Sequence, residues 1–399
     1  MSEAAVIPSA LFRILTLGYT NFDSKSRVAS LLKTKYSSST DCHVAQPDQD
    51  QPMRITYFIV LFVLFSILPE AYAQELTDVI NWTGEITLEE NEEVLTDRVN
   101  VRVEDNRFLI SDTRENQVRE YARDGTLLNY FGADDPQAPG GGWFPSTPLR
   151  MSEDTILVPN KGNGSLSLVD ENGNPLERHT HIAKSGDFDV ASLPVDGHVL
   201  FVGSANGRQG TPNFLHHLDP SSGEVTKSFY PLPGAFGSHA GFLYDISPIV
   251  RVDVYAGKIA VGFLFSNNIT LLDIDGTLLD EIEPTLSSFK KVEQTEEMPA
   301  RDEWEEELAR RSLSNTLYWL NGETLLVQFT NSYFDDQGER QLNRVLAAVT
   351  TEGEVLFEIE DTPRLLAVDQ ETGDLFFAHP DHDFESHWRV GQVKEEVLP

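Results

Sequence analysis

The stretch FLISDTRENQVREYARDGTLLNYFG, residues 108–132, indicates how this chain folds. Apolar residues alternate with polar ones in 117–123, after the apolar segment 108–111, as expected for neighbouring strands. Asp124-Gly125 is a dipeptide that favours a tight turn between antiparallel strands. The stretch therefore predicts three strands joined as an antiparallel meander.

The same pattern recurs along the chain and predicts six units of up to four strands. The turns between the first two strands of the units are expected at 105–106, 153–154, 196–197, 256–257, 321–322 and 372–373. Four-stranded meanders at a period of roughly 40 to 50 residues are typical of β-propellers. A β-sandwich followed by a second domain is the alternative, and it does not explain the periodicity.

The two ends of the repeat region predict how the propeller closes. The sixth unit lacks a fourth strand, whereas the strand-like segment Trp82–Leu88 stands alone before the first unit. One missing strand and one spare strand indicate that the N-terminal strand completes the last sheet. The fold class we predict is an all-β, six-bladed propeller of four-stranded meanders, closed by its N-terminal strand.

The first unit resembles a known repeat. Leu109-Ile110-Ser111-Asp112-Thr113, Asn116-Gln117-Val118-Arg119, Asp124-Gly125 and Phe131-Gly132 are similar to the strand, corner and turn of one NHL repeat. The later units keep only the strand spacing and the glycine turns. The chain thus resembles the secreted six-bladed NHL and TolB-like propellers of bacteria. This resemblance implies a binding scaffold or, less often in that family, an enzyme.

The composition excludes two classes of partner. The chain contains 64 acidic residues against 30 Lys and Arg, with a formal net charge of −34. So negative a surface repels phosphate backbones and anionic lipid headgroups. We therefore expect no nucleic acid partner, and the charge fits either adaptation to a salt-rich medium or an ordinary solvated surface.

The N-terminal region predicts export. Residues 53–73 combine a basic start, an apolar run from Ile55 to Leu68 and the site Ala71-Tyr72-Ala73, which together describe a signal peptide. Cleavage would leave residues 74–399 as the propeller, without membrane insertion and without cysteine, since the single cysteine is Cys42. Residues 1–52 are interpreted as an untranslated or disordered extension, and a cytoplasmic tail on a signal anchor is the alternative.

One segment interrupts the repeat. Residues 287–312, between the fourth and fifth units, include Trp304 and Leu308 at helical spacing among many charged residues. They predict a helical insertion, which either packs as a surface segment or acts as a lid.

Polar residues at the strand corners are the candidates for a binding site. In a propeller, the second-to-third strand corners and the between-blade loops leave at the same face. A ring of carboxamides there, with nearby aromatic residues, suits a polar ligand, although Asn and Asp are also common corner residues for structural reasons. The candidate ligand-binding residues are Asp112, Asn116, Asn160, Asn206, His239, Asn267, Asn331 and His379.

A short histidine-rich run offers the best candidates for a metal site. His379, Asp381 and His382 combine imidazole and carboxylate groups that suit zinc or calcium, and a solvated loop is the alternative interpretation. The sequence contains no Gly-x-Ser-x-Gly motif and, after residue 73, no cysteine nucleophile.

Two functions follow as hypotheses. The first is an exported, soluble, periplasmic or extracellular module that binds a protein, peptide or carbohydrate through the central loop face. The second is a metal-assisted hydrolase or lyase, lactonase-like or NHL-lyase-like, that uses the same face. For a lactonase, Asp112, Asn206 and Asn267 are the candidate metal ligands.

Overall fold

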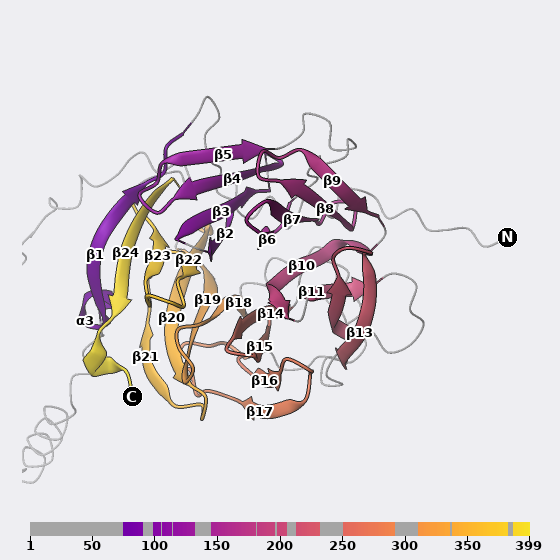
Figure 1. The fold of residues 1–399 in the computed structure, drawn as a ribbon. Coiled ribbons are helices and arrows are strands. Elements are labelled where there is room, and N and C mark those ends of the chain that lie inside the picture. Colours follow the sequence, from indigo (N-terminus) through magenta and orange to yellow (C-terminus); the bar gives the residue numbers. More distant parts are fainter. Residues whose placement is uncertain are drawn as a thin grey trace, which may run out of the picture. The chain divides into compact units, whose positions relative to one another are not determined.

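Six four-stranded antiparallel sheets are arranged as the blades of a propeller, and the described residues contain almost no helix (Figure 1). The protein is represented by a computed structural model. It describes residues 75–90, 99–104, 106–113, 115–131, 145–180, 182–195, 198–205, 213–231, 250–291, 310–335, 337–381 and 386–399. The predicted signal peptide and extension, and the helical part of the predicted insertion, lie outside these residues.

Each blade is formed by strands that follow one another in the chain, except the last. Blade 1 comprises β2 (Val99–Glu104), β3 (Arg107–Asp112), β4 (Gln117–Ala122) and β5 (Leu127–Phe131). Blade 2 comprises β6 (Leu149–Ser152), β7 (Thr155–Asn160), β8 (Ser165–Asp170) and β9 (Pro175–His179). Blade 3 comprises β10 (Ala183–Val195), β11 (His198–Ala205), β12 (Asn213–Asp219) and β13 (Glu224–Pro231).

The second half of the ring repeats this order. Blade 4 comprises β14 (Val250–Tyr255), β15 (Lys258–Phe263), β16 (Ile269–Asp273) and β17 (Leu278–Ile282). Blade 5 comprises β18 (Ser312–Trp319), β19 (Thr324–Phe334), β20 (Arg340–Thr350) and β21 (Val355–Ile359). Blade 6 comprises β22 (Leu365–Val368), β23 (Leu375–Ala378), β24 (His387–Val393) and β1 (Ile80–Thr87). The first strand of each blade lies toward the centre of the ring (Figure 1).

Blade 6 confirms the predicted closure. Strand β1 pairs antiparallel with β24, so that Glu85 lies opposite Arg389 and Thr87 opposite His387. The short helices α3 (Leu76–Val79) and η3 (Glu395–Val397) flank this pair of strands. The N-terminal strand therefore covers what would otherwise be the free edge of the last sheet.

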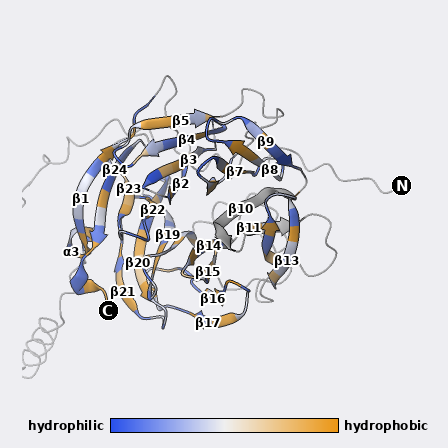
Figure 2. Ribbon diagram, in the orientation of Figure 1, coloured by the Kyte–Doolittle hydropathy of each residue, from blue (hydrophilic) through white to orange (hydrophobic). Residues whose placement is uncertain are grey.

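The hydrophobic core consists of layers between neighbouring blades. Leu271 of blade 4 and Trp319 of blade 5 belong to one buried cluster, and Phe108 of blade 1 and Trp388 of blade 6 belong to another. Figure 2 shows the corresponding hydrophobic stretches along strands such as β20 and β23. Alternate residues of one strand thus pack against the blades on its two sides, as the period of two requires.

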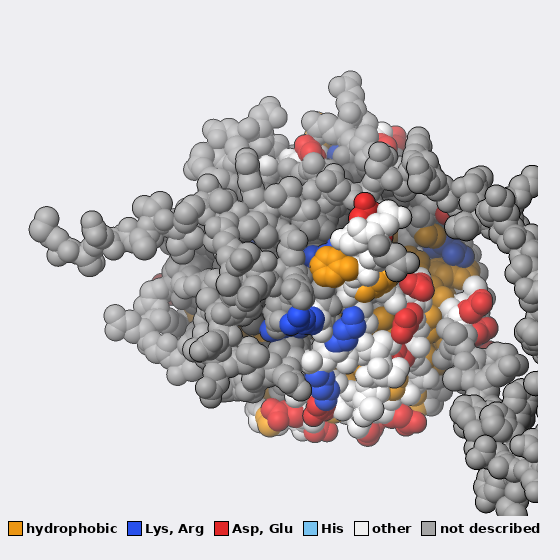
Figure 3. Space-filling model, turned by 180° about the vertical axis from the view of Figure 1, so that it is seen from behind, with side chains coloured by type: hydrophobic (Ala, Val, Ile, Leu, Met, Phe, Trp, Pro, Cys, Tyr) orange, Lys and Arg blue, Asp and Glu red, His pale blue; other side chains and the backbone are white. Residues whose placement is uncertain are grey.

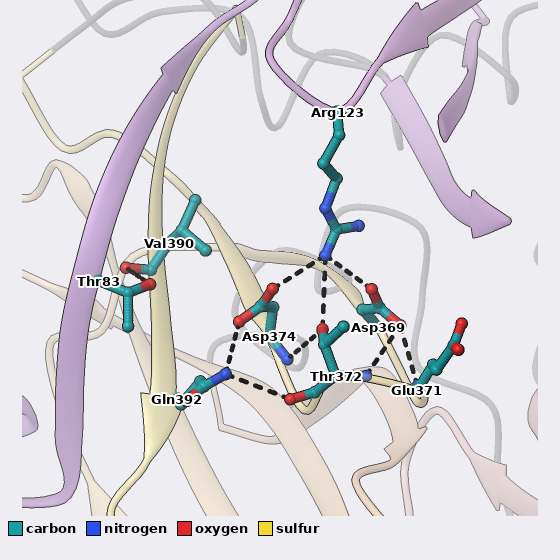
Figure 4. Close-up of polar contacts among 8 residues, drawn as sticks. All are labelled: Thr83, Arg123, Asp369, Glu371, Thr372, Asp374, Val390 and Gln392. Atoms are coloured by element: carbon teal, nitrogen blue, oxygen red, sulfur yellow. Dashed lines mark hydrogen bonds and ion pairs between the residues drawn. The ribbon is translucent and has the colours of Figure 1, made fainter. Parts of the chain in front are cut away.

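The contact between the first and last blades includes an arginine clamp. Arg123, after β4, directs Nη2 to Asp369 Oδ2 at 2.6 Å and to Asp374 Oδ2 at 2.9 Å, both in the β22–β23 connection (Figure 4). The guanidinium also lies over the ring of Phe376, at 4.6 Å from its centroid. In the same turn, Gly125 has φ +91°, and a Cβ there would lie 2.3 Å from the carbonyl oxygen of Thr87. The clamp and this close approach join blade 1 to the closed sheet.

The strand order agrees with the sequence prediction, but two hairpins are longer than predicted. In blade 3, β10 and β11 extend beyond the expected 188–193 and 198–203. We expected strands at 324–329 and 342–350, whereas β19 and β20 extend to Phe334 and from Arg340. As a result, Asn331, predicted at a corner, lies within β19 instead. The cross-strand pairing of Ser332, Tyr333 and Phe334 continues the ladder through this polar segment.

Candidate functional site

The two faces of the ring differ in the length of their connections. On one face, neighbouring strands of a blade are joined by tight turns such as 153–154, 171–174 and 256–257. The second-to-third strand corners lie at the other face. The connections between blades, which include 132–148, 232–249 and 283–311, also begin and end there. We call the second face the long-loop face. Binding residues in proteins concentrate on loops held by a rigid scaffold.

Two predicted residues on this face end their strands and are fully buried. Asp112 ends β3 and accepts a hydrogen bond from the backbone N–H of Glu115 at 3.1 Å through Oδ1. Asn160 ends β7 and donates from Nδ2 to Val158 O at 3.3 Å and to Ser167 Oγ at 3.1 Å. Asn116, in the corner after β3, has φ +57°. These side chains and this backbone conformation shape the corners.

Two further predicted residues tie the start of the insertion to the blades. Asn267 donates from Nδ2 to Pro284 O at 2.6 Å. Asn331 donates from Nδ2 to Ser288 O at 3.0 Å and accepts a hydrogen bond from the hydroxyl of Ser312. Both are buried, so in this structure they position the chain that leads into and out of the insertion.

Glu358 of β21 anchors the same segment. Its two carboxylate oxygens accept hydrogen bonds of 2.6 to 2.8 Å from the backbone N–H and hydroxyl groups of Ser287 and Ser288. Partial burial raises the pKa of Glu358, but these hydrogen bonds to the ionised form outweigh it, so that the pKa lies below its ordinary value. The first residues of the insertion are therefore held rigidly against blade 5.

The histidine-rich run lies on blade 6. His379 follows β23, and its Nε2 lies 3.6 Å from Glu85 Oε1 on the closing strand, while Nδ1 accepts from the backbone N–H of Asp381 at 3.2 Å. Among the described residues, no group of three or more His, Cys, Asp or Glu side chains is arranged to hold a metal ion. The third predicted ligand, His382, lies outside those residues, as do the candidates Asn206 and His239.

Side chains of the inner strands bind the backbone of the next blade. Glu104 Oε2 accepts from the N–H of Arg150 at 2.9 Å, and Arg251 Nε donates to Asn315 O at 2.8 Å. Tyr318 Oη donates to Leu366 O at 2.9 Å, and Arg364 Nη2 donates to Val99 O at 2.8 Å. These contacts satisfy backbone groups of the innermost strands, which have no further strand to pair with.

Asp253 contacts two other blades among these inner strands. Its Oδ2 accepts from the N–H of Trp319 at 2.7 Å and from Nε2 of Gln370 at 2.8 Å, and thereby joins blades 4, 5 and 6. Burial of the carboxylate raises its pKa to about 6, although both hydrogen bonds and the charge of Arg102 lower it. Asp253 can therefore change its charge near neutral pH.

The sequence contained a signal for these contacts of the inner strands, separate from the polar corner residues. In β14, Arg251 and Asp253 occupy alternate positions among valines, and in β2 Asn100, Arg102 and Glu104 do the same. Alternate polar residues on an otherwise apolar inner strand mark one face as polar.

Charge is distributed unevenly over the described surface. Figure 3 shows basic and hydrophobic side chains near the middle of one view, whereas Asp and Glu side chains lie mainly toward its border.

None of the helices in the described part of the chain has the length and apolar character needed to cross a bilayer.

Comparison with known proteins supports the fold class. The chain is similar to a solved member of the DUF4221 family from Bacteroides vulgatus, with a TM-score of 0.51 and 10% identity over 79% of this chain and 97% of that one. A predicted exported protein from Bacteroides fragilis gives a TM-score of 0.51 and 10% identity, over 81% and 97% of the two chains. No family model matches the sequence, and neither does any curated protein. The class defined by fold and similarity is thus a six-bladed β-propeller.

Proposed function

We propose that the protein is an exported propeller of the NHL/TolB-like type that binds a protein, peptide or carbohydrate ligand through its long-loop face. The observation that carries this proposal is the contrast between the two faces. All the described turns of one face are tight, while the long connections between blades begin and end on the opposite face, which also holds the anchored start of the insertion. A rigid ring with variable loops on one side is a common architecture for recognition.

Separate observations support the NHL-like type and the export of the protein. In blade 1, the Asp112 corner, the left-handed Asn116 and the Asp124-Gly125 turn adopt conformations that explain the NHL-like sequence pattern. Export is favoured by the sequence of residues 53–73 and by the likeness to a predicted exported protein. A metal-assisted hydrolase or lyase on the same face is the second candidate. Asp253, whose raised pKa would suit proton transfer, does not support it, because its partner Gln370 lies in the β22–β23 turn of the opposite face.

A blocking experiment tests the binding face. Because residues 74–399 contain no cysteine, a single introduced cysteine can carry a maleimide-linked polyethylene glycol chain of known size. Asn268→Cys lies at an exposed corner of the long-loop face, and Glu352→Cys lies at an exposed tight turn of the opposite face. We expect the polymer at position 268 to weaken binding of ligands selected from a peptide library and an oligosaccharide panel by at least about tenfold, because it occludes the face.

The matched polymer at position 352 should change affinity less than about twofold. Equal losses for the two variants, or a larger loss at position 352, would contradict the assignment of the face.

A further inference from the structure

The hairpin β19–β20 extends beyond its blade on the long-loop face. The pairing of β18 with β19 begins at Ser312 and Asn331, and the pairing of β20 with β21 begins at Leu346 and Ile359. Residues 332–334 and 340–342 therefore pair only with each other. We call this two-stranded extension the ribbon.

Two large aromatic side chains are exposed at the end of the ribbon. Tyr333 is 51% exposed and Phe334 is 46% exposed. Because they are neighbours in a strand, their rings lie on opposite faces of the ribbon. Each face thus presents one aromatic platform to solvent.

The ribbon is held firmly at both ends. At its tip, Asp335 accepts hydrogen bonds from Gln341 Nε2 and from the backbone N–H groups of Glu339 and Gln337, at 2.8 to 2.9 Å. These hydrogen bonds, that of Gln341 first, lower the pKa of Asp335. At its base, Lys290 Nζ donates to Ser332 O at 3.1 Å. An aromatic group on a rigid support loses little conformational entropy when a ligand binds.

The face that carries Tyr333 also carries carboxamides. Gln341 lies directly opposite Tyr333, and Asn331 lies opposite Asn343 one step nearer the blade on the same face. The bond from Gln341 Nε2 to Asp335 fixes the carboxamide, and the amide oxygen of Gln341 has no hydrogen-bond donor among the described residues. An aromatic ring beside an oriented amide can stack on the C–H face of a sugar and accept a hydrogen bond from its hydroxyls.

The edges of the ribbon favour a sugar over an added peptide strand. A peptide would need backbone acceptors along one edge. The carbonyl of Ser332 on one edge already accepts from Lys290, and that of Arg344 on the other accepts from the N–H of Thr362 at 3.0 Å. The net charge of −34 also disfavours an anionic ligand.

We propose that the Tyr333 face of the ribbon is a subsite for a neutral oligosaccharide, with Tyr333 as the stacking platform and Gln341 as the hydrogen-bond acceptor. This inference rests on the proposed function, because it names the ligand class of the long-loop face.

Calorimetric titration of residues 74–399 with cellohexaose, laminarihexaose, xylohexaose and maltohexaose tests the subsite. We expect at least one of them to bind, and Tyr333→Ala to weaken that binding about tenfold, since the stacking contact is lost. Tyr333→Phe keeps the platform and should stay within about threefold of the unmodified protein. Tyr130→Ala is the matched control, because Tyr130 is also 51% exposed but lies on the outer strand β5.

The outcomes separate this inference from the proposed function. Binding that Tyr333→Ala leaves unchanged, with the same unfolding midpoint, would overturn the subsite. If none of the four oligosaccharides binds while a selected peptide does and is blocked by the polymer at position 268, the carbohydrate assignment is overturned and the proposed function stands. If polymer at position 268 blocks no ligand of either kind, the proposed function fails as well.

Discussion

Removal of residues 75–87, which hold α3 and β1, is expected to abolish the cooperative unfolding of the ring. Val79 and Ile80 are almost fully buried, and Trp82 packs on Phe377 at a centroid distance of 5.5 Å and beneath Arg389. Burial of such side chains contributes about 1.5–3 kcal/mol each, and the net stability of a domain is only about 5–15 kcal/mol. The loss of three of them, together with the pairing to β24, therefore approaches the whole stability of the fold.

Urea unfolding followed by tryptophan fluorescence, with light scattering to detect association of the exposed β24 edge, measures this effect. A synthetic peptide of residues 75–90 should restore the transition when added in trans, because it can pair again with β24. A shortened protein with the same midpoint and slope as the intact one would show that the ring does not depend on this strand.

The second large effect concerns Asp253. Because its pKa in the folded protein is raised to about 6 from the ordinary 3.8, the folded state binds this proton more tightly than the unfolded state does. The contribution of Asp253 to stability is therefore fully present below pH 3.8 and is lost as the pH rises through about 6. The difference between the two pKa values corresponds to about 3 kcal/mol.

Asp253→Asn provides the reference, since the amide oxygen can still accept the hydrogen bond from Trp319 but does not titrate. The free energy of unfolding of the unmodified protein, minus that of the variant, should fall by about 2 kcal/mol between pH 4 and pH 7. A difference that stays constant over this range in urea titrations would mean that the carboxyl has an ordinary pKa.

Much of the fold could be predicted because its signals are local. The Asp124-Gly125 turn and the spacing of glycine turns define strand ends within a few residues, and the spare strand before the first unit predicted the pairing of β1 with β24. The ribbon was missed for the same reason. Two segments here resemble turn sequences, Asn331-Ser332 and Asp335–Gly338. Cross-strand pairing and the hydrogen bond from Lys290 nevertheless extend the strands through Asn331-Ser332.

The candidate site was less accessible to prediction because it depends on residues distant in the chain. Asp112, Asn160, Asn267 and Asn331 look like ligand-binding groups in sequence, but the structure gives each an intramolecular hydrogen bond. The pKa of Asp253 is raised by burial of its carboxyl in the closed ring, where Trp319 and Gln370 of two other blades donate hydrogen bonds to it. A sequence pattern shows that a residue is polar, whereas its partners follow from the closed ring.

Amide hydrogen exchange tests most directly the central claim that ligands bind at the long-loop face. The measurement compares residues 74–399 alone and saturated with the tightest ligand from the oligosaccharide and peptide panels. We predict slower exchange in 286–291 and 330–343, which lie at this face, and unchanged exchange in the tight turns 122–127 and 350–355. Slower exchange concentrated in those turns, with 330–343 unchanged, would contradict the account.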